Sequence, residues 1–149
     1  MEVNKILCAV DLEDTIAPSV EYAKMKASMT GASILVAYVI PAHTPYEDVY
    51  LSVNNQPNEV NNPNETIQKS MNALLAEQFA GMDATGVILV GRPSEELVKL
   101  AEEKGANLIV MGTHGRAGFD RLLFGSVAHE VVRAAPCPVM TVRPLMPKK

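Results

Sequence analysis

The stretch that decides the fold runs from Leu108 to Val142 and reads LIVMGTHGRAGFDRLLFGSVAHEVVRAAPCPVMTV. Its apolar start predicts a buried strand ending at Met111, followed by a loop with glycines at 112, 115 and 118 and a helix that opens at Gly125-Ser126. Glycines let backbone N–H groups approach a ligand closely. The first N–H groups of a helix, together with its dipole, attract anions. The stretch therefore predicts an anion site, and phosphate is the anion that we expect.

The composition of the whole chain limits the class of protein. With 149 residues, 48% of them hydrophobic and 20% charged, the chain is expected to form one globular domain over residues 1–149. The net charge is −4 and no basic run occurs, which argues against a nucleic-acid-binding protein. No secretion signal and no apolar run of about 18 residues is present, so we expect a cytoplasmic protein without a membrane segment. Cys8 and Cys137 stand among apolar residues and are expected to be buried, reduced thiols.

Short apolar runs alternate with helical patterns along the chain. The runs predict five strands, at Lys5–Val10, Ser33–Ile40, Thr85–Val90, Asn107–Met111 and Val139–Val142. Such alternation is typical of an α/β protein with a parallel sheet and helices on both faces. Right-handed connections then give a doubly wound fold, which binds its ligand at the carboxyl edge of the strands near a switch point.

Four helices are expected between these strands. Their ends are marked by Gly31, Gly81, Gly105 and Pro136, and capping oxygens precede the first two, at Glu13, Asp14 and Thr15 before Pro18 and at Asn64. The expected inward-facing residues are Val20, Ala23, Met25, Ala27 and Met29; Ile67, Met71, Leu74, Leu75 and Phe79; Leu97, Val98 and Ala101; and Val127, Val131, Val132 and Ala135.

Residues 41 to 63 interrupt this regular pattern. The segment is rich in proline and asparagine and too long for an ordinary connection, so we expect a flexible insertion. A short helix or edge segment at Tyr46–Val53 is one alternative. A gate over the ligand, a partner surface and a solvated loop all remain open as roles for the insertion.

The glycine loop resembles a known nucleotide motif. Two residues separate Gly112 from Gly115, nine separate Gly115 from Gly125, and Ser126 follows. This spacing resembles the motif of the universal stress protein family, in its ATP-binding branch. The resemblance implies a five-stranded sheet of order 3-2-1-4-5, similar to the adenine nucleotide alpha hydrolase-like fold, and a homodimer formed through the last strand. It also implies ATP, or alternatively AMP or ADP, as the ligand, with Mg²⁺ carried by the phosphates.

The resemblance and the strand ends together suggest a set of nucleotide-binding residues. Backbone donors to the phosphates are expected at Gly112, Gly115, Gly125, Ser126 and Val127, with Arg116 either reaching a phosphate or projecting into solvent. Asp11 and Val39 are expected to frame the adenine and ribose, and Ala9 and Met111 complete the set. Ser126 could equally act as a plain helix cap, and Asp11 could cap the first helix.

Motifs for catalysis or metal binding are weak in this sequence. A Walker A loop and a dinucleotide fingerprint are both missing, and His43, His114 and His129 do not have the spacing of a metal cluster. Ser126, His129 and Glu130 are triad residue types, but they sit on one predicted helix without a nucleophile elbow. We therefore expect a nucleotide-dependent regulatory module with no catalytic or metal-binding residue. The alternatives are a weak ATPase or phosphotransferase that uses Asp11 or His114, and a nucleotide-free dimeric scaffold.

Overall fold

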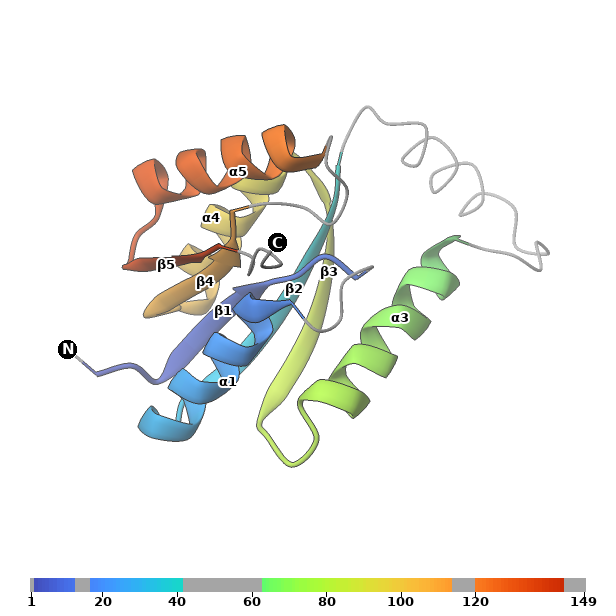
Figure 1. Cartoon of the computed structure of the whole chain (residues 1–149), viewed down its shortest axis with the longest axis vertical. Coiled ribbons are helices and arrows are strands. Elements are labelled where there is room, and N and C mark those ends of the chain that lie inside the picture. Colours follow the sequence, from blue (N-terminus) through green and yellow to red (C-terminus); the bar gives the residue numbers. More distant parts are fainter. Residues whose placement is uncertain (1, 13–16, 42–62, 114–119, 144–149) are drawn as a thin grey trace, which may run out of the picture.

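The computed structural model describes residues 2–12, 17–41, 63–113 and 120–143, where strands and helices alternate (Figure 1). The strands are β1 (Lys5–Ala9), β2 (Ser33–Pro41), β3 (Ala84–Gly91), β4 (Leu108–Gly112) and β5 (Val139–Val142). The helices are α1 (Pro18–Thr30), α3 (Pro63–Gln78), α4 (Pro93–Lys104) and α5 (Asp120–Ala134). Each predicted strand is confirmed to within one residue at either end. The expected insertion, including Tyr46–Val53, falls almost entirely outside the described residues.

The five strands form one parallel sheet in the order β3-β2-β1-β4-β5, which confirms the predicted fold class and strand order. β1 lies at the centre, between β2 and β4. β2 is longer than β1, because Ala9 at the end of β1 pairs with Ala37 while β2 continues to Pro41. The carboxyl edge of the sheet is therefore stepped, and β2 and β3 project beyond the end of β1.

Helices cover both faces of the sheet. Figure 1 shows α1 and α3 on one face and α4 and α5 on the other. Side chains of a strand alternate between the two faces, so Ile6 and Cys8 pack in the cluster under α1 and α3, whereas Leu7 and Ala9 pack in the cluster under α4 and α5. Burial of the sheet on both faces explains why its strands read as nearly continuous apolar runs.

The glycines predicted to end helices agree with the structure better than the residues predicted to cap helix starts. Gly31 and Gly105 both adopt the left-handed conformation and end α1 and α4 as predicted. The cap of α1 is Ala17, which makes no side-chain cap hydrogen bond, so the expected cap is wrong; residues 13–16 lie outside the described part. Pro18 is the first residue of α1. Proline fits there because it lacks an N–H group, and the first N–H groups of a helix have no partner within the helix. α3 begins at Pro63, one residue before the predicted cap Asn64.

The predicted apolar faces hold for α3 and only partly for the other helices. On α3 the expected stripe is confirmed, and Met71 and Leu74 are fully buried. On α1 the prediction is wrong for Met25 and Met29, which are exposed while Val20, Ala23 and Ala27 face the core. On α4 Leu100 is buried although it was not predicted to be, and Val98 is only half-buried. On α5 Val132 is exposed, and Ala128 is buried instead.

A single side chain fixes the start of β1 against the start of β4. The Oδ1 atom of Asn107 accepts hydrogen bonds from the backbone N–H groups of Asn4 (2.8 Å) and Lys5 (2.9 Å). The N–H group of Asn107 donates in turn to the carbonyl oxygen of Lys5 (2.8 Å). These three bonds set the register of the two central strands before their regular pairing begins at Ile6 and Leu108.

We expect Asn107→Ala to lower the free energy of unfolding by about 1–3 kcal/mol, because two backbone donors lose their acceptor. The loss is to be measured by urea denaturation. Asn107→Asp is the matched control, since a carboxylate keeps the acceptor oxygens, and it should retain most of the stability. Equal losses in both variants would contradict the role given to this acceptor.

Candidate functional site

The two central strands separate at the carboxyl edge of the sheet. Their pairing includes Cys8 with Val110. Beyond this point the N–H group of Val10 donates to the carbonyl oxygen of Ala37 in β2 (2.9 Å), and the N–H group of Thr113 donates to that of Val142 in β5 (3.1 Å). Each central strand therefore stays hydrogen-bonded to its outer neighbour beyond its last pairing with the other central strand.

The chain also leaves these two strands in opposite directions. β1 leads into α1 on one face of the sheet, whereas β4 leads into α5 on the other face. Such a switch point is where open α/β sheets bind their ligands. The divergence of β1 and β4 therefore makes this edge the candidate site.

Two of the predicted site residues stand on either side of the divergence. Asp11 follows the end of β1 by two residues and is half-buried. Gly112 is the last residue of β4 and pairs with Val142. The topology therefore brings an acidic side chain and a glycine backbone, which are about one hundred residues apart in sequence, to one edge of the sheet.

Four further predicted residues gather on the face covered by α4 and α5. Ala9, Val39, Met111 and Val127 belong to one apolar cluster, and each is at most 9% exposed. Val39 lies two residues beyond the level of Ala9, about 7 Å further along the sheet. This apolar cluster fills the face of the sheet just below the carboxyl edge.

The start of α5 differs from the prediction. The helix begins at Asp120, five residues before Gly125, so the expected start at Gly125-Ser126 is wrong. Gly125, Ser126 and Val127 therefore lie in the second turn, where N–H groups bond to carbonyl oxygens four residues back. The N–H groups without such a partner are those of the first turn of the helix. In this structure the three predicted donors are engaged within the helix.

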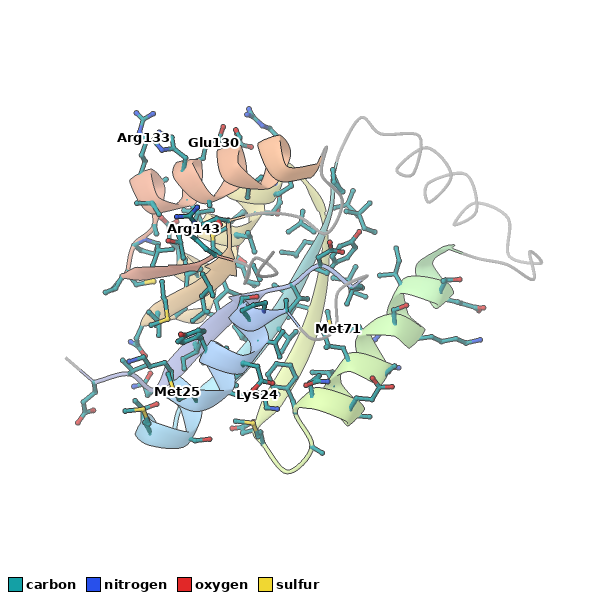
Figure 2. The ribbon with its side chains drawn as sticks, viewed as in Figure 1. Lys24, Met25, Met71, Glu130, Arg133 and Arg143 are labelled. Atoms are coloured by element: carbon teal, nitrogen blue, oxygen red, sulfur yellow. The ribbon has the colours of Figure 1, made fainter. Side chains whose placement is uncertain are left out.

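Some of the remaining residues predicted for the site lie outside the described part of the chain. Gly115, Arg116 and His114 lie in residues 114–119, which the structure does not describe. His129 is exposed on α5. Glu130, whose place on α5 Figure 2 shows, accepts a hydrogen bond from the hydroxyl group of the buried Ser94 on α4. This bond joins α4 to α5 across 36 residues, and neither residue carries a local sequence signal for it.

Two kinds of feature are absent from the described part of the chain. Within residues 2–12, 17–41, 63–113 and 120–143, no group of three or more His, Cys, Asp or Glu side chains could hold a metal ion. In the same ranges, none of the helices combines the length and apolarity that crossing a membrane requires.

A buried thiol lies close to the candidate site. Cys8 is fully buried in β1, and burial raises the pKa of its thiol from 9.0 to about 12. Cys137 is half-buried, against the expectation of a buried thiol, and burial also raises its pKa. Because only the thiolate is nucleophilic, Cys8 is a core residue and not a catalytic group.

Comparisons with known proteins agree with this architecture. Residues 2–143 match the model of the Universal stress protein family. The chain is 28% identical to Universal stress protein MJ0577 of Methanocaldococcus jannaschii, with 94% of each chain covered, and 33% identical to a universal stress protein of Thermus aquaticus, with 93% of this chain and 97% of the relative covered.

Solved structures show the same fold. The structure of MJ0577 superposes with a TM-score of 0.76 and 25% identity, covering 99% of this chain and all of the other. A universal stress protein from Archaeoglobus fulgidus, solved in complex with dAMP, superposes with a TM-score of 0.58 and 25% identity over 95% of this chain and 98% of the other.

The pKa of Cys8 predicts a loss of stability at alkaline pH. Between pH 9 and 12 the unfolded chain releases the Cys8 proton while the folded chain retains it, so the free energy of unfolding falls as the pH rises through this range. We expect the fall, measured by urea denaturation from pH 8 to pH 11, to be shallower in Cys8→Ala. Equal slopes for the two proteins would show that this thiol does not contribute to the alkaline transition.

Proposed function

The chain belongs to the universal stress protein family, and from this premise we propose that it binds ATP as a nucleotide-dependent regulatory module. The observation that carries the proposal is the divergence of β1 and β4, with Asp11 on one side and Gly112 on the other. The complex of the Archaeoglobus fulgidus relative with dAMP supports an adenine nucleotide as the ligand.

In this proposal each part of the nucleotide has its own surface at the site. The base packs toward the apolar residues Ala9, Val39 and Met111, on the face below α4 and α5. The carboxylate of Asp11 accepts hydrogen bonds from the ribose or the adenine. The phosphates extend toward Gly112 and the glycine loop, where Gly115 and Arg116 follow in the sequence, and Mg²⁺ arrives with them. AMP or ADP occupies the same site with fewer phosphate contacts.

The position of α5 makes nucleotide binding a conformational event in this proposal. Gly125, Ser126 and Val127 can donate to phosphate only if their hydrogen bonds within the helix are released. Residues 120–124 would then leave the helix, and α5 would begin at Gly125, where its free N–H groups meet the anion. A glycine at this point lowers the cost of the break by about 1 kcal/mol relative to alanine.

The proposal also includes a homodimer that forms through β5. This strand lies at one edge of the sheet and pairs only with β4 among the described strands. Its four residues include neither a charged residue nor a proline, the features with which proteins usually protect a free edge. Pairing of two β5 strands would satisfy the open backbone groups of both chains.

We expect Gly115→Val to abolish ATP binding in isothermal titration calorimetry while the circular dichroism spectrum stays unchanged. A β-branched side chain would block the close approach of the loop backbone to phosphate. Ala117→Val, in the same loop but outside the glycine set, is the matched control and should keep the affinity. Unchanged affinity in Gly115→Val would contradict the assignment of this loop.

We expect ATP turnover to stay at trace level, because no catalytic base is assigned at the site. Phosphate release under burst and steady-state conditions measures it, with Asp11→Ala and His114→Ala beside the wild type. Turnover that one of these variants removes would favour the enzyme alternative. A protein that neither binds ATP on titration nor carries co-purified nucleotide in mass spectrometry would be the nucleotide-free scaffold.

A further inference from the structure

A carboxylate outside the predicted set of site residues lies at the carboxyl edge of the sheet. β3 ends at Gly91, and α4 begins two residues later with Glu96 in its first turn. The side chain of Glu96 lies back over the end of the strand, because a Cβ atom built on Gly91 would lie 2.8 Å from both its Cγ and its Oε1 atom. The φ angle of Gly91 is +154°, which other residues rarely adopt. Any other residue at this position would therefore displace the carboxylate or strain the strand.

Glu96 stands on the same face of the sheet as the apolar residues toward which the base packs in the proposed site. Side chains alternate between the two faces along a strand. In β3, Ile88 packs in the cluster under α1 and α3, and Leu89 in the cluster under α4 and α5. Gly91 is two residues beyond Leu89 and presents the same face, where Glu96 covers it. Val39 of β2 belongs to this face as well.

The register of β2 and β3 gives the separation between Val39 and the carboxylate. Val39 pairs with Leu89, and Pro41 pairs with Gly91. Neighbouring strands lie about 4.8 Å apart and rise about 3.3 Å per residue, so the backbone at Gly91 is about 8 Å from that at Val39. This span is comparable to the length of a purine ring plus one hydrogen bond. A base beside Val39 therefore brings its far edge within reach of the Glu96 side chain.

The carboxylate of Glu96 is available to a ligand. It is half-buried, and none of the hydrogen bonds and ion pairs found among the described residues engages its oxygen atoms. The neighbouring Glu95 is exposed and forms an ion pair with Arg92 (3.3 Å). Because withdrawing a carboxylate from water is unfavourable unless a donor compensates, a ligand group that donates to Glu96 would be favoured at this edge.

We propose that Glu96 determines the base specificity of the nucleotide site by accepting a hydrogen bond from the 6-amino group of adenine. The inference rests on the proposed nucleotide site and adds the side chain that selects its base. The 6-amino group is a hydrogen-bond donor, whereas guanine carries a carbonyl oxygen at the same position, and a carboxylate repels that acceptor. Asp11 is then left to the ribose.

Purine riboside triphosphate tests this role, since it differs from ATP only in lacking the 6-amino group. In isothermal titration calorimetry the wild-type protein should bind ATP about 10- to 100-fold more tightly than this analogue, as expected for one hydrogen bond to a charged group. Glu96→Ala should remove most of this preference. The readout is the ratio of the two dissociation constants, because a purely structural role of Glu96 would weaken both nucleotides alike.

Two further variants serve as controls for charge and for the acceptor oxygen. Glu95→Ala removes the neighbouring carboxylate from the same helical turn and should keep the wild-type ratio. Glu96→Gln keeps an acceptor oxygen without the charge and should retain part of the preference for ATP. Loss of the preference in Glu95→Ala as well as in Glu96→Ala would assign it to the charge of the helix start and overturn the specific role of Glu96.

The remaining outcomes separate this inference from the proposed function. Equal affinities of the wild-type protein for ATP and the analogue would overturn the role of Glu96 while the nucleotide site stands. The same conclusion follows if Glu96→Ala keeps the wild-type ratio, whether or not both affinities fall. A wild-type protein that binds neither nucleotide would overturn the nucleotide site, and this inference with it.

Discussion

The pairing of β1 with β4 is the constraint on which the rest of the structure depends. These strands are about one hundred residues apart, yet they lie side by side at the centre of the sheet. At one end the side chain of Asn107 locks them together through the N–H groups of Asn4 and Lys5. At the other end their pairing stops after Cys8 and Val110, while each strand stays hydrogen-bonded to β2 or β5. A strand pair that is joined at its start and separates at its end is the arrangement in which open α/β sheets bind ligands at the carboxyl edge.

The two faces of the sheet differ in the way their helices pack on it. On the face of α4 and α5, the apolar cluster of Ala9, Val39 and Met111 continues up to the carboxyl edge and includes Val127 of α5. The hydrogen bond between Ser94 and Glu130 joins this helix to α4. On the other face α1 packs across β1 and β4, and Tyr22 at its start lies beside the end of β5.

Much of the fold could be predicted because it follows local patterns. The strand runs are buried on both faces and so stand out as apolar, and Gly31 and Gly105 mark helix ends that need a positive φ. The order of the strands came from the resemblance of the Gly112–Ser126 spacing to a family, since alternation alone leaves it open. The prediction that Met25 and Met29 face the core is wrong, because apolar side chains can also lie on the exposed side of a helix. The role of Asn107 could not be predicted from its neighbours in the sequence, because it depends on hydrogen bonds to a strand that is distant in sequence. The start of α5 was misread because Gly125 resembles a helix start, although the helix runs through it.

In the proposed site, main-chain amides of α5 hold the phosphates of a nucleotide between β1 and β4. A crystal structure of the protein grown with a non-hydrolysable ATP analogue and Mg²⁺ tests it most directly. We expect a triphosphate on the N–H groups of Gly125, Ser126 and Val127, with α5 beginning at Gly125 and the base beside Asp11 and Val39. An analogue bound elsewhere, or an α5 that still begins at Asp120 with the phosphates away from these amides, would contradict it.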